Sequence, residues 1–233
     1  MGARLRWQAV GGETGLKRGA VFTAFCLVCV LFLSSCSSFP FFSSSKKSKR
    51  AAKWNIGPPE PPKSELPYRD VNLSCPLSAI QAPKIYVYKN ERRLLLIDGQ
   101  TLVRDYRVGL GPHPNGDKFM QGDGRTPEGE YFICTKNSAS KFYKSLGLSY
   151  PSQKHAEHAY GSGYISREEY ENIVGALGNK TLPPFNTVLG GAIFIHGGGG
   201  QRDWTEGCVA VYNGAMDELF QAVSIGTPVQ ICP

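Results

Sequence analysis

The chain is poor in long apolar runs and in histidine, and it lacks two common catalytic motifs, which excludes several classes of protein. Its one long apolar run, Ala20 to Leu33, is shorter than the roughly 20 apolar residues that a membrane-spanning helix needs. Of the 4 histidines, His155 and His158 stand at positions i and i+3, which is not the spacing of a zinc-protease helix. The glycines Gly197 to Gly200 lack the Lys-Ser or Lys-Thr ending of a phosphate-binding loop. No internal repeat is visible either.

Positive charge is concentrated near the start of the chain, although the formal net charge is +7. Residues 1–35 hold four basic side chains against one acidic side chain, and five more basic residues lie between Lys46 and Lys53. The remaining residues, 54–233, therefore carry a net charge of −1. A nearly neutral domain offers no basic patch for phosphates, so no nucleic acid is expected as a partner.

Residues 1–35 have the organisation of a secretion signal. Basic residues precede the apolar run, and small residues follow it. The tetrapeptide Leu-Ser-Ser-Cys at 33–36 resembles a bacterial lipobox, which implies a lipid on Cys36 and a membrane anchor through it. Ser37 is similar to the class that is not retained in the inner membrane, so we expect a periplasmic protein anchored to the outer membrane. The alternative is an ordinary signal peptide or an uncleaved anchor in which Cys36 is incidental.

Residues 36–78 predict a flexible linker. The segment is rich in Ser, Lys and Pro, so it is too polar to bury a core, and its proline part is semi-extended. Its basic cluster is expected to be a solvated part of the tether, with attraction to anionic lipid or wall polymer as the alternative. The folded domain is then expected over residues 79–233.

The remaining segments are mostly short and apolar, which predicts a mainly β domain with a few helices. Strands are expected at 84–89, 93–97, 102–108, 130–134, 192–195 and 227–231. The Asp98-Gly99 turn predicts that the second and third of them form a hairpin. Helices are expected over 166–177, where Ser166 and Glu169 make a capping box, and over 213–223, where Asn213 serves as the cap.

One stretch has the residues of a thiol nucleophile and its base. His196 ends an apolar segment, and Cys208 begins another one after a glycine-rich loop. A free thiol has a pKa of roughly 8.5, and a neighbouring imidazole can lower that pKa by several units. The N–H groups of Gly207 and Cys208 suit an oxyanion that forms during acyl transfer. The alternative is a small core cysteine and a structural histidine.

Several motifs in order along residues 82–231 resemble one family. They are Ile85 to Lys89 (IYVYK), Gly122 to Tyr131 (GDGRTPEGEY), Ser145 to Pro151 (SLGLSYP), Asn186 to Gly191 (NTVLGG), His196-Gly197, and Thr205 to Cys208 (TEGC). Together they are similar to the YkuD-like L,D-transpeptidase catalytic domain, which acts on bacterial peptidoglycan. The resemblance implies a β-sandwich of mixed sheets with a few short helices, in which the cysteine and the histidine meet in a groove.

The same resemblance implies roles for individual residues. Cys208 falls on the nucleophile, His196 on the general base, and Gly197 on the residue whose carbonyl orients the imidazole. The N–H groups of Gly207 and Cys208 match the oxyanion hole. No metal or organic cofactor is implied.

Departures from the family pattern leave the acceptor open. Glu206 stands where many members carry a second histidine, and Ala210 stands where many carry Arg or Asn. These departures resemble a subgroup of short proteobacterial proteins with Asp-Trp-Thr-x-Gly-Cys, here Asp203 to Cys208. The carboxylates of Asp203 and Glu206 flank the thiol in sequence and are expected to be solvated.

Further site residues are weaker candidates. Trp204, Thr205 and Tyr150 are candidates to line the groove, although aromatic residues in a β domain are more often core residues. Arg125 and Asp123 are candidates for substrate contact, but their Gly- and Pro-rich stretch is typical of a structural turn. The cysteine count also leaves a choice, because Cys75, Cys134 and Cys232 are odd in number and one pair, such as Cys75 with Cys232, can form.

The leading hypothesis is therefore a cysteine L,D-transpeptidase that remodels peptidoglycan. It would form an acyl-enzyme on Cys208 from a tetrapeptide stem and pass the acyl group to another stem's amine or to a lipoprotein lysine. The first alternative is a hydrolase on the same fold, either an L,D-carboxypeptidase or an amidase that releases wall-linked lipoprotein. The second alternative is a non-catalytic lipoprotein that binds peptidoglycan.

Overall fold

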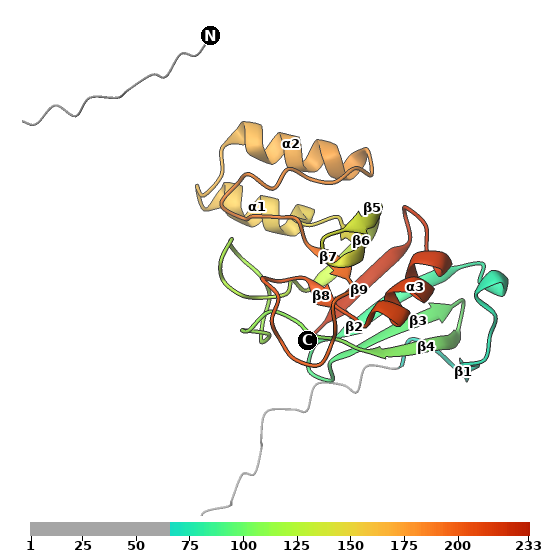
Figure 1. Ribbon diagram of the computed structural model, residues 1–233. Helices are drawn as coiled ribbons and strands as arrows, with labels where there is room; N and C mark the ends of the chain where they lie inside the picture. Colours follow the sequence, from blue (N-terminus) through green and yellow to red (C-terminus); the bar gives the residue numbers. More distant parts are fainter. Residues whose placement is uncertain (1–65) are drawn as a thin grey trace, which may run out of the picture. The chain divides into compact units, whose positions relative to one another are not determined.

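The structure is a computed structural model that describes residues 66–233. The predicted signal, Cys36 and most of the predicted linker lie outside these residues. Figure 1 shows the described part. Its strands are β1 (Asp70–Val71), β2 (Pro83–Tyr88), β3 (Arg93–Asp98), β4 (Thr101–Arg107), β5 (Gly129–Ser140), β6 (Tyr143–Leu148), β7 (Phe194–His196), β8 (Val209–Ala210) and β9 (Pro228–Cys232). The helices are the 3₁₀ helix η1 (Leu77–Ala79), α1 (Gln153–Gly161), α2 (Arg167–Gly178) and α3 (Asn213–Ala222).

The strands form a mixed arrangement in the order β1-β4-β3-β2-β9-β5-β6-β7-β8. β5 joins its two halves, because its first residues pair with β9 and its later residues pair with β6. The pairs β2–β9 and β7–β8 are parallel, and so is the edge pair β1–β4. The predicted hairpin of β3 and β4 is present. The prediction of a mainly β fold of mixed sheets with a few short helices is confirmed.

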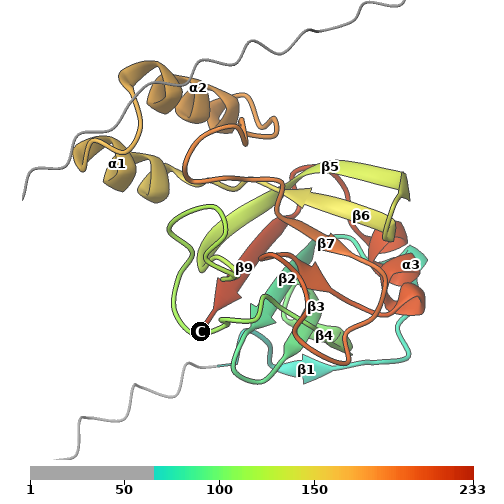
Figure 2. The same ribbon diagram turned by 60° about the vertical axis from the view of Figure 1, so that its left-hand side comes forward.

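Alternation along the strands builds the core. In β2, Ile85 and Val87 are fully buried, whereas Lys84 is exposed. This period of two places one face of β2 against the interior, whereas in β3 the four residues from Leu94 to Ile97 are all buried. The main core also contains Leu94, Leu96, Tyr131, Ile133, Leu146, Leu148, Ile195, Val209, Met216, Leu219, Val229 and Ile231. Helix α3 packs on β6 and η1, while α1 and α2 pack on each other beside the β5–β6 hairpin (Figures 1 and 2).

The folded part begins earlier than predicted. Residues 70–79, almost all of which were expected to belong to the linker, contain β1 and η1. β1 adds to the edge of the sheet through backbone bonds, with Arg69 N donating to Gln100 O at 2.8 Å and Asn72 N to Leu102 O at 2.9 Å. A two-residue strand held by its backbone leaves no period in the sequence.

Two predicted features of the helices had different outcomes. The capping box of α2 is confirmed, with Glu169 N donating to Ser166 Oγ at 3.1 Å and Ser166 N to Glu169 Oε2 at 2.7 Å. The predicted cap of α3 is wrong, because Asn213 is the first helical residue and Tyr212 occupies the cap position. The Asn213 side chain instead accepts a hydrogen bond from Gly198 N at 2.9 Å, so it supports the glycine-rich loop.

A long loop between β4 and β5 is fixed by two charged residues, the buried Lys89 and the half-buried Asp117. Lys89 Nζ donates to Gly116 O at 2.6 Å, to Thr126 O at 2.8 Å and to Glu128 Oε1 at 2.8 Å. Burial lowers the pKa of this lysine, and Glu128 opposes the shift. The loop is thereby tied to the end of β2.

Asp117 ties the same loop to α1. Its carboxylate accepts hydrogen bonds from Glu128 N at 2.7 Å, Lys154 Nζ at 2.6 Å and His155 Nε2 at 3.2 Å. Burial alone would raise the pKa of Asp117, but these donors outweigh it and hold the pKa well below its ordinary value. The sequence did not predict α1 because its buried face is small, consisting of His155, Ala156 and Ala159.

None of the helices in residues 66–233 is long and apolar enough to cross a membrane. The cysteines of this region, Cys75, Cys134, Cys208 and Cys232, are free thiols. The possible Cys75–Cys232 disulfide is therefore not formed in this structure.

Candidate active site

The cysteine and histidine singled out by the sequence lie in one cleft of about 630 Å³. Its walls come from the loop before β5, the β5–β6 hairpin, the segment that leads into β7, and the segment that leads into β8. The lining residues are Lys118, Gln121, Gly122, Asn137, Ala139, Ser140, Lys141, Phe142, Ser145, Phe185, Gly190, Gly191, Ala192, Ile193, Phe194, His196, Trp204, Thr205, Glu206 and Cys208.

Strand pairing places Cys208 and His196 on the same face of the cleft wall. β7 and β8 are parallel, with Ile195 opposite Val209 and His196 opposite Ala210. Side chains alternate along a strand, so Cys208 points to the same side as Ala210 and therefore as His196. The predicted pair is thus brought together by two short, consecutive strands that the glycine-rich loop connects.

The imidazole of His196 is held in one tautomer. Its Nδ1 lies 2.6 Å from the carbonyl oxygen of Gly197. Because a carbonyl can only accept, Nδ1 carries the proton, and the lone pair of the neutral ring is on Nε2. Burial lowers the pKa of His196, the Gly197 carbonyl opposes this, and the charge of Lys141 lowers the pKa further. His196 is therefore a neutral base at pH 7.

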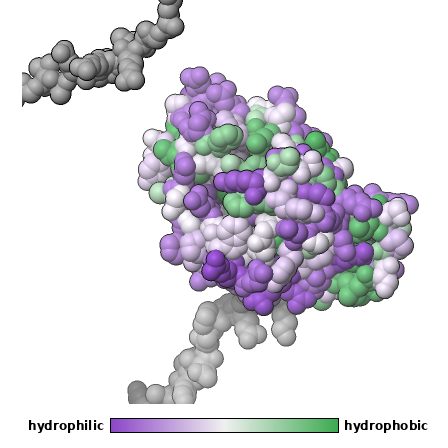
Figure 3. All heavy atoms as spheres, viewed as in Figure 1, coloured by the Kyte–Doolittle hydropathy of each residue, from purple (hydrophilic) through white to green (hydrophobic). Residues whose placement is uncertain are grey.

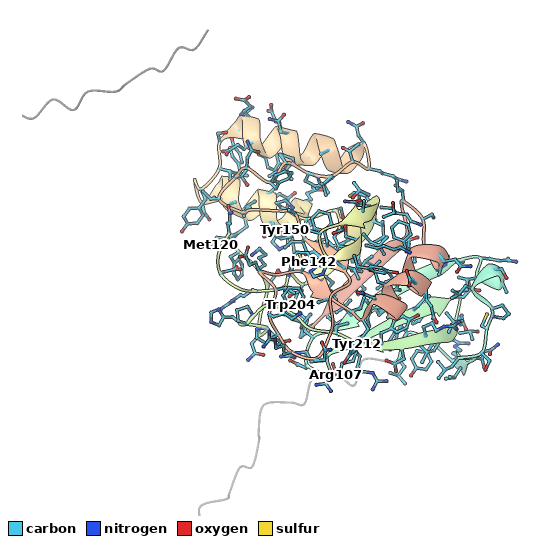
Figure 4. The ribbon with its side chains drawn as sticks, viewed as in Figure 1. Arg107, Met120, Phe142, Tyr150, Trp204 and Tyr212 are labelled. Atoms are coloured by element: carbon cyan, nitrogen blue, oxygen red, sulfur yellow. The ribbon has the colours of Figure 1, made fainter. Side chains whose placement is uncertain are left out.

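Two aromatic side chains fix the plane of the imidazole. Phe142 stacks on His196, with ring centroids 4.6 Å apart and planes at 22°. Trp204 meets the same ring edge-on, with centroids 5.5 Å apart, and its Nε1 donates to Gly199 O at 3.0 Å. Both residues are labelled in Figure 4. Together with the Gly197 carbonyl, they leave Nε2 as the free edge of the ring.

The thiol of Cys208 is partly buried and protonated. Its Sγ accepts from Phe194 N at 3.4 Å and donates to Ala192 O at 3.6 Å. Burial raises its pKa to about 11, against a smaller opposing effect of the Phe194 N–H. Among the described residues, no hydrogen bond joins this sulfur to His196. In the resting structure the imidazole therefore does not lower the pKa of the thiol, and the pair consists of a neutral thiol and a neutral base.

The two predicted oxyanion donors, the N–H groups of Gly207 and Cys208, differ in their hydrogen bonds. Gly207 N donates to Thr205 Oγ1 at 3.2 Å, and the same hydroxyl donates to Cys208 O at 2.7 Å. The N–H of Cys208 has no partner among residues 66–233. Gly207 has φ of +129°, and a Cβ there would lie 2.7 Å from Arg125 O, so the turn before the thiol requires glycine. Thr205 thus organises this turn and also lines the cleft.

Two predicted substrate contacts are wrong. Tyr150 is fully buried in the core, where its hydroxyl donates to Leu189 O at 3.2 Å. Arg125 does not line the cleft, and its guanidinium donates to Asp117 O at 3.2 Å. In a loop no regular spacing indicates the direction of an aromatic or basic side chain, so the sequence did not distinguish a structural side chain from one that lines the cleft.

The acidic residues near the thiol have separate roles. Asp203 forms an ion pair with Arg92 at 2.7 Å and accepts from Leu110 N at 2.9 Å, so its expected solvated state is wrong. Asp123 accepts from Phe119 N, Lys118 Nζ and Arg125 N, which makes it a structural residue of its loop. Glu206 is exposed and lines the cleft.

A second, larger hollow of about 920 Å³ lies between α1 and the loop before β5. Its walls include the exposed apolar side chains of Phe119, Met120, Tyr164 and Val188. Figure 3 shows apolar residues gathered over the α1–α2 part of this face. It shares Gln121 with the cleft but contains no thiol, so it is not the candidate active site.

The comparisons with known proteins agree with this fold. Residues 82–231 match the family model YkuD, the L,D-transpeptidase catalytic domain. The chain therefore belongs to the YkuD family of L,D-transpeptidase catalytic domains. A search of curated proteins finds no match.

The search of solved structures finds matches to part of this chain. An L,D-transpeptidase from Xylanimonas cellulosilytica matches with 15% identity over 66% of this chain and 61% of that chain, with a TM-score of 0.38. The helical cell shape determining protein Pgp2 from Campylobacter jejuni matches with 18% identity over 66% and 48%, with a TM-score of 0.43. An L,D-transpeptidase from Mycobacterium smegmatis matches with 9% identity over 65% and 58%, with a TM-score of 0.38. The chain covers less than two thirds of each of these three proteins.

Proposed function

We propose that this protein is a cysteine L,D-transpeptidase that acts on peptidoglycan tetrapeptide stems. The observation that carries the proposal is the shared cleft in which the Cys208 thiol and the free Nε2 edge of His196 face the same side. Membership of the family supports the general reaction class. The proposal further specifies an amine as the acceptor of the acyl group.

The reaction begins with a proton transfer. Cys208 Sγ exchanges its bond to Ala192 O for one to His196 Nε2, gives its proton to this nitrogen, and attacks the carbonyl carbon of the diamino acid at position three of the stem. The oxyanion that forms is stabilised by the unpaired N–H of Cys208. Gly207 N–H adds to this stabilisation if it leaves Thr205.

Collapse of the intermediate breaks the peptide bond to the terminal D-Ala. His196 returns its proton to the leaving amine, and a thioester remains on Cys208. An incoming amine then loses a proton to His196 and attacks the thioester, which restores the thiol and forms a new amide. The Gly197 carbonyl and the two aromatic rings keep Nε2 directed at the reaction throughout.

Hydrolysis is the second candidate reaction. Glu206 is an exposed carboxylate in the cleft wall, and such a group orders water near the thioester. With water as the acceptor, the products are a tripeptide or a released lipoprotein. The same residues, Cys208 and His196, would catalyse transfer to an amine and hydrolysis, so the two reactions are distinguished by their products.

We also propose that the protein is periplasmic and held at the outer membrane by a lipid on Cys36. The lipobox-like tetrapeptide at 33–36 supports this location, and the following linker supplies the reach to the wall. Peptidoglycan stems are then the partners within reach of the domain, and wall-linked lipoprotein is a further candidate.

The test is mass spectrometry of muropeptides after incubation with the purified protein. Wild type is expected to convert disaccharide-tetrapeptides into dimers with a 3→3 bond, and Cys208→Ala is expected to form none. Cys134→Ala, which removes a buried free thiol elsewhere, is the matched control and should retain activity. Tripeptides alone would identify a carboxypeptidase, and unchanged muropeptides in every sample would contradict the enzyme proposal and favour a binding protein or a lipoprotein-specific amidase.

A further inference from the structure

The cleft contains three charged side chains among its lining residues, and two of them are free. These are Lys118, Lys141 and Glu206. Lys118 is buried, and its Nζ donates to Asp123 Oδ1 at 2.7 Å and to Met120 O at 3.1 Å. Lys141 and Glu206 are exposed, and neither forms an ion pair or side-chain hydrogen bond with another described residue. Lys141 is therefore the available cation of the cleft wall.

Lys141 is placed close to the reacting groups by the turn between β5 and β6. Its Nζ lies 4.8 Å from the centroid of the Phe142 ring, which itself stacks on His196 at 4.6 Å. Burial is the main cause of the lowered pKa of His196 and of the raised pKa of Cys208, but the charge of Lys141 lowers both values. The ammonium group is thus within electrostatic range of the bond that is broken.

The proposed substrate carries a negative charge at the matching place. When the leaving group is a terminal amino acid, its carboxylate is one carbon away from the nitrogen that departs. Binding at the active site brings this carboxylate within a few ångströms of Cys208 and His196, where an unpaired anion is costly unless a cation meets it. Glu206 repels such a group, so the charges of the cleft favour a position of the carboxylate near Lys141 and away from Glu206.

We propose that Lys141 is a specificity-determining residue that binds the free carboxylate of the leaving amino acid. This inference rests on the proposed function and specifies its substrate. With Lys141 in this role, the enzyme selects stems that end in a free carboxylate over stems whose end is amidated. The flexible lysine chain and the Phe142 ring beneath it let the ammonium group follow the carboxylate as the bond breaks.

The test compares two donor peptides, a tetrapeptide with a free terminal carboxylate and the same peptide with a terminal carboxamide. For the first, Lys141→Met is expected to lower kcat/KM about 10-fold, mainly through KM, since one charge-assisted contact is removed. For the carboxamide, the same variant is expected to change kcat/KM less than about 2-fold. Lys141→Arg should restore most of the preference.

Lys144→Met is the matched control, because Lys144 is a neighbouring lysine that pairs with Asp217 at 2.6 Å and does not line the cleft. It should behave as wild type with both peptides. Equal losses for both peptides with Lys141→Met would overturn the inference alone, since Lys141 would then act on the catalytic pair and not on the carboxylate. No release of the terminal residue from either peptide by wild type would overturn the proposed function together with this inference.

Discussion

Replacement of His196 by glutamine is expected to lower the rate of acylation by about 10³-fold, which is the scale of a lost general base. The effect is large because burial holds the Cys208 thiol at a pKa of about 11, so attack depends on proton removal, and His196 is the neutral imidazole base that shares the cleft with it. Glutamine keeps a polar side chain of similar length, so the fold is expected to remain. The measurement is single-turnover release of the terminal amino acid from a tetrapeptide.

The pH dependence gives a second view of the same residue. The pKa of His196 is lowered in the folded protein, so its base form is present above that pKa and is lost as the pH falls through it. Wild-type activity should therefore persist below the ordinary histidine pKa before it declines, whereas His196→Gln should lack this decline. The control is His158→Gln, an exposed histidine outside the cleft. A decline that is unchanged in His196→Gln would assign the titration to another group.

Replacement of Lys89 by methionine is expected to lower the free energy of unfolding by about 3–5 kcal/mol, the scale of breaking a buried charge pair. Lys89 is 1% exposed and donates to three acceptors that would lose their partner, including the Glu128 carboxylate. Methionine fills a similar volume, so the loss would report the hydrogen bonds and the charge. Urea unfolding followed by circular dichroism measures it.

Lys84→Met is the matched control, because Lys84 is an exposed lysine on β2, the strand that Lys89 directly follows. Its effect should stay within about 0.5 kcal/mol. Activity should fall with Lys89→Met even below the unfolding transition, since the loop that it fixes supplies Lys118, Gln121 and Gly122 to the cleft. A cost below about 1 kcal/mol would mean that the loop is held by other contacts.

Much of the fold could be predicted because its strands alternate and its turns have typical residues. All six predicted strands are present, and the Asp98-Gly99 turn placed the β3–β4 hairpin correctly. β6 was not predicted, because Gly147 interrupts its apolar pattern. The full length of β5 was not predicted, because the second half of this strand is polar. The polar second half of β5 is held by pairing with β6, which no local pattern reports.

The site was predicted where chemistry restricts the residue type and missed where only the tertiary structure decides. The positions of Cys208, His196 and Gly197 follow from the motifs, and the hydrogen bond from the imidazole to Gly197 O is present. Phe142 was missed because it lies at the tip of an unpredicted hairpin, and an aromatic residue there has no distinguishing pattern. Asn213 looked like a helix cap, yet its side chain supports the glycine-rich loop instead.

Cys208 is expected to carry the acyl group, and the intact mass of the protein after brief mixing with a tetrapeptide donor tests this directly. The expected mass increase equals the mass of the donor minus the mass of the released terminal amino acid. The added group should map to the peptide containing Cys208 and be released by hydroxylamine, as a thioester should be. Cys134→Ala should show the same adduct and Cys208→Ala none. An adduct on another residue, or turnover of the donor by Cys208→Ala, would show that Cys208 is not the nucleophile.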